Sequence, residues 1–293
     1  MELGRIGVWT SALDRQPASV AREAAAEIEQ LGYGALWVGE ATRREAFANA
    51  ALLLSATERI VVATGIANIW VRDATCMAAG QRTLAEAWNG RFLLGLGVSH
   101  QPLVSARGHR YERPLAAMRA YLDAMDAAPY GAPSPAPGTL VRVLAALGPR
   151  MLRLSAERAD GAHPYLVPPE HTRWARELLG PAKLLCPEVP VVLEEDPRRA
   201  REIARRHLGA YLALENYRRN LLRLGFTAEE LAGPAAERVV DAVVAWGGLE
   251  RVVRRVREHL EAGADHVAVQ VLDDDPARLP RQQWRDLAGA LLD

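Results

Sequence analysis

Short apolar runs of strand length alternate with helical stretches from one end of the chain to the other. The first pair shows the pattern: "RIGVWTSAL" predicts a strand, and residues 17–32 predict a helix with Pro17 in its first turn and Gly32 at its end. The same pattern predicts eight strands, which lie within residues 5–13, 34–41, 59–70, 92–96, 140–148, 160–167, 189–195 and 265–272.

Repeated strand–helix units with buried-type strands predict a parallel sheet, which we expect to close into a (β/α)8 TIM barrel. An open doubly wound sheet is the alternative architecture. The helical stretch at 197–263 exceeds one crossover and predicts extra helices inserted between strands seven and eight. The Pro/Ala/Gly-rich segment 129–139 is typical of a loop or a linker. Because the alternation resumes directly after it, we expect a single domain over residues 1–293.

The composition narrows the classes of partner. The formal net charge is +0 and 49% of residues are hydrophobic, whereas a nucleic-acid binder usually carries a basic excess. Cys76 and Cys186 form no close-spaced pair, so neither a disulfide framework nor a zinc knuckle is predicted. Residues 1–20 lack the pattern of a signal peptide, and no apolar stretch is long enough to span a bilayer. We therefore expect a cytoplasmic protein that binds a small molecule, and neither nucleic acid nor membrane.

In such a barrel the active site lies where the strands end and the following loops begin. The residues that the sequence places there are Trp9, Glu40, Gly65, Ile66, Asn68 and Trp70 from strands one to three, and Gly97, Val98, Ser99, His100, Gly148, His163 and Tyr165 from strands four to six. Single glycines usually mark close packing or tight turns. Together, Gly65, Gly95, Gly97 and Gly148 indicate a mouth with room for a flat ring against the main chain.

The segment "ALGPRML" predicts a subsite for phosphate. Gly148 precedes Pro149, which suits the first turn of a helix whose free N–H groups favour an anion. Arg150 could add positive charge to this subsite. Gly-Pro also precedes many helices that bind no anion, so the motif is weak by itself.

Two residues are candidates for proton transfer. His100 directly follows the glycine-rich end of strand four, and an imidazole with an ordinary pKa of about 6.5 exchanges its proton near neutral pH. Glu40 stands at the end of strand two, where burial can raise the pKa of a carboxyl group toward a useful range. The alternatives are a structural histidine and an ion pair between Glu40 and one of the many arginines.

Other chemistries fit the residues less well. A Schiff-base enzyme needs a lysine near the mouth, and Lys183 precedes strand seven at the opposite end. A metal-dependent barrel hydrolase would need converging ligands, for which His100, His163, Glu40 and Glu194 are available. No two histidines are spaced like a ligand pair, so we expect no metal and keep the hydrolase as a runner-up.

A family resemblance is carried by five segments: "LGYGALWVGEA", "RIVVATGIANIWVRDA", "TLAEAWNGRFLLGLGVSH", "YERPLAAMRAYLDAM" and "LAALGPRMLRLSAERADGAHPY". They resemble the luciferase-like monooxygenase superfamily, and more closely its actinobacterial branch of deazaflavin (coenzyme F420)-dependent oxidoreductases. The likeness extends over nearly the whole chain in the same order.

The resemblance implies a barrel with coenzyme F420 at its mouth, with FMN as the alternative cofactor. It implies a non-proline cis peptide at Gly65–Ile66 behind the ring. The residues expected to bind cofactor are Gly65, Ile66, Asn68, Gly97, Val98, Ser99, Gly148, Pro149, Arg150 and Tyr165, and those expected to contact substrate are Trp9, Trp70 and His163. Sugar-phosphate dehydrogenase relatives carry Asp-His where this chain has Glu40-Ala41, which leaves His100 as the best candidate for proton transfer.

The expected activity is hydride transfer between C5 of F420 and a small organic substrate, with His100 and Glu40 as the catalytic residues. The alternatives are an FMN-dependent luciferase-like monooxygenase and a non-catalytic barrel that binds a flavin or F420. Members of the superfamily are commonly dimers, and the apolar helix "NAALLLSAT" could supply a seam, so we expect a homodimer.

Overall fold

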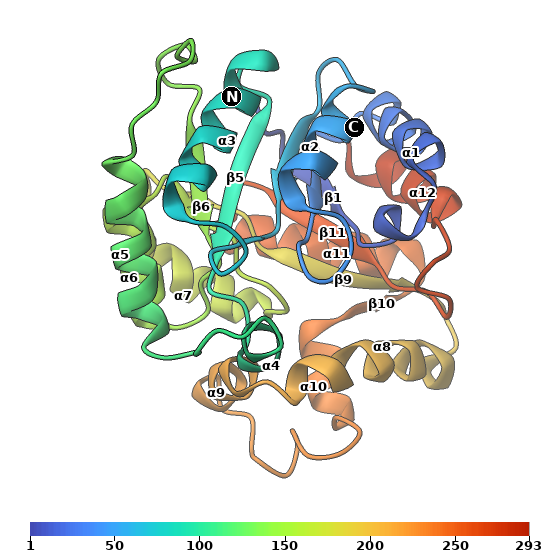
Figure 1. The fold of residues 1–293 in the computed structure, drawn as a ribbon. Coiled ribbons are helices and arrows are strands. Elements are labelled where there is room, and N and C mark those ends of the chain that lie inside the picture. The colour runs from blue at the N-terminus through green and yellow to red at the C-terminus, as the bar shows by residue number, and fades with distance from the viewer. Residues whose placement is uncertain (293) are drawn as a thin grey trace.

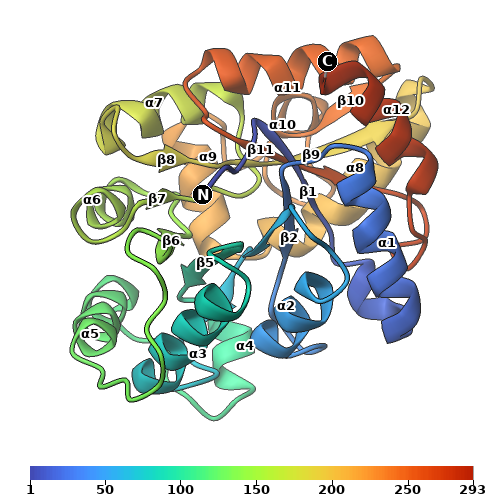
Figure 2. The ribbon, with the colours of Figure 1, turned by 90° about the horizontal axis from the view of Figure 1, so that it is seen from above.

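In the computed structural model, which describes residues 1–292, an inner layer of parallel strands is surrounded by helices (Figures 1 and 2). The strands are β1 (Ile6–Trp9), β2 (Ala35–Val38), β3 (Val61–Thr64), β4 (Ala67–Asn68), β5 (Phe92–Gly97), β6 (Val141–Leu144), β7 (Gly161–Ala162), β8 (Leu184–Leu185), β9 (Glu188–Leu193), β10 (Ala245–Gly247) and β11 (Val267–Val271). The helices are α1 (Ala18–Gln30), α2 (Ala46–Leu54), α3 (Ala74–Ala87), α4 (Gln101–Ser105), α5 (Pro114–Asp126), α6 (Pro149–Arg158), α7 (Pro169–Leu179), α8 (Pro197–Leu212), α9 (Glu215–Arg223), α10 (Glu237–Val243), α11 (Leu249–Glu261) and α12 (Arg281–Leu291), with a 3-10 turn η1 (Leu13–Arg15).

The sheet closes into a barrel through one bent strand. β8 and β9 are consecutive pieces of the segment 184–193. β8 pairs with β7, with Leu185 opposite Ala162, while β9 pairs with β11, with Glu188 opposite Ala268. β11 pairs with β1, from which the ladder runs through β2, β3, β5 and β6 back to β7. The predicted (β/α)8 barrel is therefore confirmed, and the open sheet is wrong.

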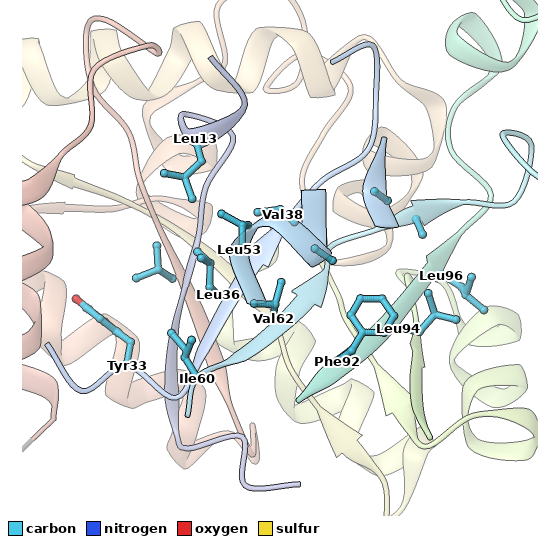
Figure 3. Close-up of a cluster of buried hydrophobic side chains, with 14 of the residues drawn as sticks. Leu13, Tyr33, Leu36, Val38, Leu53, Ile60, Val62, Phe92, Leu94 and Leu96 are labelled. Carbon is cyan, nitrogen blue, oxygen red and sulfur yellow. The ribbon is translucent and has the colours of Figure 1, made fainter. Parts of the chain in front are cut away.

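Side chains of the strands alternate between the barrel interior and the surrounding helices. The cluster in Figure 3 packs the outward side chains Leu36, Val62 and Leu94 of β2, β3 and β5 with Leu53 of α2. The inward side chains form a second cluster, to which the same strands contribute Trp37, Ala63 and Leu93. Because both faces are buried, these strands are nearly continuous apolar runs in the sequence.

The structure adds short elements that the alternation does not predict. α4 follows the fourth barrel strand directly, and β10 lies inside the inserted region, where Ala245 pairs with Val191 of β9. The same region contains α8, α9 and α10, so the expected extra helices are confirmed. The third predicted strand is divided into β3 and β4 by the bulge at Gly65–Ile66. Elements of two to five residues are too short to show a period in the sequence.

The apolar run of α2 faces the barrel. Ala50, Leu53 and Leu54 are fully buried in the core. Ala51 and Leu52 are partly exposed. Most of the run that suggested a dimer seam is therefore internal packing. Within residues 1–292, no helix combines the length and the apolar character that a membrane crossing needs.

Candidate functional site

The carboxyl ends of the barrel strands meet at the end of the molecule where α4, α8, α9 and α10 lie (Figure 1). Four of the predicted site residues are in contact there. The Trp9 Nε1 group donates a hydrogen bond to the Gly65 carbonyl (3.1 Å), and its ring meets Tyr165 edge to face at 5.4 Å. On the interior side of the same glycine, a Cβ atom would lie 2.9 Å from His163 Nε2.

The bulge after β3 is packed tightly against β5. Its Gly65–Ile66 peptide is cis, as the resemblance implies. A Cβ on Gly95 would lie 1.9 Å from the Thr64 carbonyl oxygen, and one on Gly97 would lie 2.5 Å from the Ile66 side chain. The bulge therefore occupies the space that these two glycines leave. The sequence pattern indicated an open space here, but the space is filled. The two glycines therefore serve close packing.

Glu40 is held by four hydrogen bonds at the base of this bulge. Its carboxylate accepts from the Ala46 N–H at the start of α2 (3.1 Å) and from the Asn68 N–H in β4 (2.8 Å). Nη1 and Nη2 of Arg72 both donate to it, and the two side chains are 7% (Arg72) and 2% (Glu40) exposed. The ion pair, which was the alternative to acid–base catalysis, is the arrangement in the structure.

The loop after β5 is tied to the bulge segment through backbone groups. The Trp70 Nε1 group donates to the Val98 carbonyl (2.9 Å), and the Tyr111 hydroxyl donates to the Ser99 carbonyl (3.3 Å). Ser99 has a φ of 56°, in the left-handed region. Trp70, Val98 and Ser99 are all partly exposed, so this part of the mouth is open to a ligand.

His100 follows directly and is half-buried at the start of α4. Its Nδ1 atom is buried without a hydrogen-bond partner, and its ring lies 5.6 Å from that of Tyr217 in α9. Burial lowers the pKa of His100, and a hydrogen bond with the Asn216 side chain partly opposes that shift. The imidazole is therefore neutral at neutral pH and is able to accept a proton.

His163 lies in the barrel interior, below the mouth. It is 2% exposed and stacks on Trp37 with ring centroids 4.3 Å apart. Its Nδ1 atom contacts the Cys186 carbonyl at 2.6 Å, and burial lowers its pKa to about 4. Because Nδ1 must donate to a carbonyl, Nε2 carries no proton. The structure does not place this residue where the predicted substrate contact would be direct.

An aromatic cluster covers the opposite side of the mouth. We define it as Trp9, Tyr165, His207, Tyr211 and Tyr217, from β1, the segment after β7, α8 and α9. Tyr211 donates a hydrogen bond to Tyr165 (2.9 Å), and the ring of Tyr211 lies 4.9 Å from His207 and 5.1 Å from Tyr217.

The last three members of this cluster escaped the sequence reasoning, because that reasoning searched only strand ends. Their one sequence signal is the spacing of His207 and Tyr211 by four residues, which places both on one face of a helix. The tertiary structure alone shows that this face is turned toward Tyr165.

The predicted anion subsite gains a cation from the inserted region. Gly148 caps α6, and Pro149 is the first residue of that helix. A Cβ on Gly148 would lie 3.8 Å from the guanidinium of Arg223 in α9, which also lies over the Trp174 ring at 5.7 Å. Arg223 forms no ion pair with a carboxylate of residues 1–292. Its charge is therefore available at the start of α6, where Arg150 is exposed.

The candidate metal ligands do not converge. Within the described residues, no three His, Cys, Asp or Glu side chains are grouped in a way that could hold a metal ion. Glu194 pairs with Arg199 (3.1 Å), and Glu40 pairs with Arg72.

The closed parallel barrel, the bulge on its third strand and the helix start after its fifth strand define a class of (β/α)8 barrels with a ligand site at the carboxyl end. More specifically, the chain belongs to the luciferase-like monooxygenase family, whose sequence model matches residues 3–266. A Mycobacterium tuberculosis protein named as a coenzyme F420-dependent oxidoreductase is 33% identical over 125 residues, which cover 42% of this chain and 35% of that protein. The 5,10-methylenetetrahydromethanopterin reductase of Methanolobus tindarius is 30% identical over 149 residues, which cover 45% and 46%. The chain thus matches less than half of the length of each of these relatives.

Solved structures share the fold at low sequence identity. An F420-dependent secondary alcohol dehydrogenase, solved with an F420–acetone adduct, has a TM-score of 0.76 at 15% identity and covers 99% of this chain and 98% of its own. The F420-dependent tetrahydromethanopterin reductase of Methanopyrus kandleri has a TM-score of 0.73 at 14% identity, with 99% of both chains covered. The oxygenating constituent of the 3,6-diketocamphane monooxygenase of Pseudomonas putida, solved with FMN, has a TM-score of 0.73 at 16% identity and covers 98% and 97%.

Proposed function

We propose that this protein is an F420-dependent oxidoreductase that transfers a hydride between C5 of the deazaflavin and a small organic substrate. The observation that carries the proposal is the cis bulge at Gly65–Ile66 at the same end of the barrel as the start of α6, beside which Arg223 lies. One relative is named for F420, and the other is named as a reductase of a methanopterin. The solved structures that share the fold include two F420-dependent enzymes, one of which is also a methanopterin reductase. The family resemblance agrees with this chemistry.

The residues of the mouth fit such a cofactor. Gly148, Pro149, Arg150 and Arg223 would hold its phosphate, because free N–H groups at a helix start and a guanidinium that is bonded to no carboxylate both favour an anion. Ile66, Val98 and Ser99 would line its ring, and the buried Asn68 and Gly97 would hold that lining in place from behind. Tyr165 would lie between ring and phosphate. When bound, the deazaflavin supplies the carbon that gives or takes the hydride.

His100 would move the accompanying proton. Its neutral imidazole has a buried nitrogen without a partner and stands beside the loop that carries Val98 and Ser99. A general acid or base contributes roughly 10²–10⁴-fold to a rate. Glu40, whose four hydrogen bonds leave it no free role in proton transfer, would position the bulge.

An FMN-dependent monooxygenase is the second candidate, favoured by the fold shared with the FMN-bound oxygenating protein. Titration of the protein with F420 and with FMN, followed by fluorescence quenching, separates the two. We expect F420 to bind more tightly, and tighter binding of FMN would favour the second candidate. Absence of binding by both would refute a cofactor site.

His100→Ala tests the proton-transfer role. We expect turnover to fall by at least about 10²-fold while affinity for F420 stays nearly constant. Ser105→Ala is the matched control, because Ser105 is exposed at the far end of α4, the helix that starts beside His100. Joint loss of F420 binding and turnover in His100→Ala would make His100 a wall of the site instead.

The assembly and location belong to the same proposal. We propose a cytoplasmic homodimer with a two-fold interface above about 1,000 Å2 in total. Sedimentation at micromolar concentration tests it, and a monomer throughout would refute it.

A further inference from the structure

The aromatic cluster indicates which class of substrate the site takes. We infer that the substrate is an uncharged molecule with an apolar or aromatic body and one hydrogen-bonding oxygen, such as an alcohol or a carbonyl compound. This inference rests on the proposed function, because it assumes that the substrate meets the cofactor at this mouth.

The cluster is placed where a substrate would meet the ring. Trp9 connects it to the bulge, since the Trp9 Nε1 group donates to the Gly65 carbonyl while its ring meets Tyr165. Tyr165, His207 and Tyr211 are only partly buried, so the cluster reaches the surface of the mouth. The wall they form is aromatic and comes from the inserted helix α8 and the segment after β7.

The groups in this wall carry no charge at neutral pH. Burial lowers the pKa of His207 to about 4 and raises that of Tyr211 to about 12. Glu188, which points into the barrel beneath the tyrosines, is fully buried, and burial raises its pKa to about 8. Its Oε2 atom accepts from the Leu166 N–H (3.0 Å), and no Lys, Arg or His side chain of residues 1–292 pairs with it.

Two carboxylates that follow the neighbouring strands are already paired. Glu194 after β9 pairs with Arg199 at 3.1 Å, and Asp273 after β11 contacts Arg278 at 3.6 Å. A charged substrate group placed against the cluster would lose its hydration and would meet neutral groups in exchange. The burial of an unpaired charge costs far more than the burial of an uncharged hydroxyl or carbonyl group.

The hydrogen bonds of the cluster leave two side chains for a ligand. The Tyr165 hydroxyl donates to Gln270 Oε1 (2.7 Å) and accepts from Tyr211, so its single donor is used. The His207 side chain has only a 3.5 Å contact with that hydroxyl among the described residues, and the Tyr217 hydroxyl has ring contacts within the cluster but no hydrogen bond to a described residue. The imidazole, with one N–H donor and one acceptor, and the Tyr217 hydroxyl are therefore able to bond a ligand oxygen.

Four probes that share one ring and differ in charge test the inference: benzyl alcohol, benzaldehyde, benzoate and benzylamine. Their binding to the protein saturated with F420 is measured by ligand-detected NMR, which does not depend on turnover. We expect benzyl alcohol and benzaldehyde to bind at least about tenfold more tightly than benzoate and benzylamine. Equal or tighter binding of benzoate or benzylamine, or no binding of the neutral probes, would overturn the inference.

Two variants locate the site. His207→Phe should weaken benzyl alcohol about tenfold, and Tyr211→Phe, which keeps the ring volume, should have a smaller effect through Tyr165. Tyr130→Phe, in the segment that leads into β6 at the opposite end of the barrel, is the control and should change nothing. Unchanged binding in both cluster variants would overturn the placement. The F420 titration tests the proposed function independently, and that function fails if F420 does not bind. In that case the same four probes are measured on the cofactor-free protein, and their order of affinity tests the inference about charge.

Discussion

The two sides of the barrel mouth differ in charge: one side contains a buried ion pair, and the other contains neutral polar groups. On the bulge side, a charged pair is buried and every oxygen of Glu40 is used by Arg72 or by backbone N–H groups. On the cluster side, the polar groups are neutral and His207 keeps hydrogen-bonding capacity. A saturated buried charge fixes the position of the segments that it joins, whereas an unsaturated neutral group is free to receive a ligand.

The two sides of the mouth also come from different parts of the chain. The bulge side is made by the ends of the barrel strands and the helix starts beside them, which the barrel itself keeps in place. The cluster side depends on α8 and α9, which belong to the insertion between β9 and β11. Under the proposed function, the barrel would hold the cofactor ring, and the inserted helices would supply the substrate wall and Arg223.

Removal of one partner of the buried pair should have the largest effect. Arg72→Met leaves the Glu40 carboxylate buried without its cation, and we expect the free energy of unfolding to fall by about 3–5 kcal/mol. The matched control is Arg119→Met, which breaks the exposed pair of Arg119 with Glu157 (3.0 Å) and should cost less than about 1 kcal/mol. Urea unfolding of both variants measures the difference. Equal costs would remove the distinction between the two sides of the mouth.

Glu188 should make stability depend on pH on the cluster side. Its pKa is raised from 4.5 when unfolded to about 8 when folded, so the folded protein keeps a proton that the unfolded chain releases. Between pH 6.5 and 8 this group by itself lowers the free energy of unfolding as pH rises, by at most about 1.4 kcal/mol per pH unit.

The pKa values of the buried histidines are lowered from 6.5 in the folded protein, so up to about pH 7.5 the unfolded chain binds protons that the folded protein does not, and this opposes the Glu188 slope equally in wild type and variant. Glu188→Gln keeps the shape of the protonated acid, and its free energy of unfolding should lack the fall that Glu188 contributes. Urea unfolding at several pH values in that window decides the matter, and an identical slope in wild type and variant would exclude the raised pKa.

Gly95→Ala tests how tightly the bulge is packed. Its Cβ would lie 1.9 Å from the Thr64 carbonyl oxygen, a backbone atom that cannot move away freely. We expect a loss of about 1–3 kcal/mol. Gly209→Ala in α8 is the control: no atom lies within 4 Å of its Cβ position, so the better helix former should stabilise by up to about 1 kcal/mol. Thermal unfolding that shifts both variants in the same direction would contradict the packing described here.

Arg223→Gln should have the smallest effect, confined to cofactor affinity. Loss of a cation at the start of α6 should weaken F420 about tenfold, with no change in thermal stability. Arg153→Gln is the control, because Arg153 is exposed on the same helix beyond its first turn. Fluorescence titration compares the two, and equal weakening in both would mean that only the general charge of this surface matters.

The sequence by itself determined the barrel, its one long insertion and the helix start at Gly148–Pro149. These features are local: strand and helix lengths repeat along the chain, and proline and glycine restrict the backbone at their own positions. The strand-end rule also brought Trp9, Gly65 and Tyr165 together in advance, because parallel strands share one carboxyl end. The resemblance added the cis peptide at Gly65–Ile66.

Only the tertiary structure decided which side chains meet. Arg72 reaches Glu40 across 32 residues of sequence, and Tyr211 reaches Tyr165 across 46. The sequence left Glu40 open between catalysis and an ion pair, and the path of the chain through the bulge brings Arg72 to it. His163 points into the barrel because of its position along the strand. Such contacts depend on how the chain returns to the mouth after a barrel circuit or an insertion, and no local pattern encodes that direction.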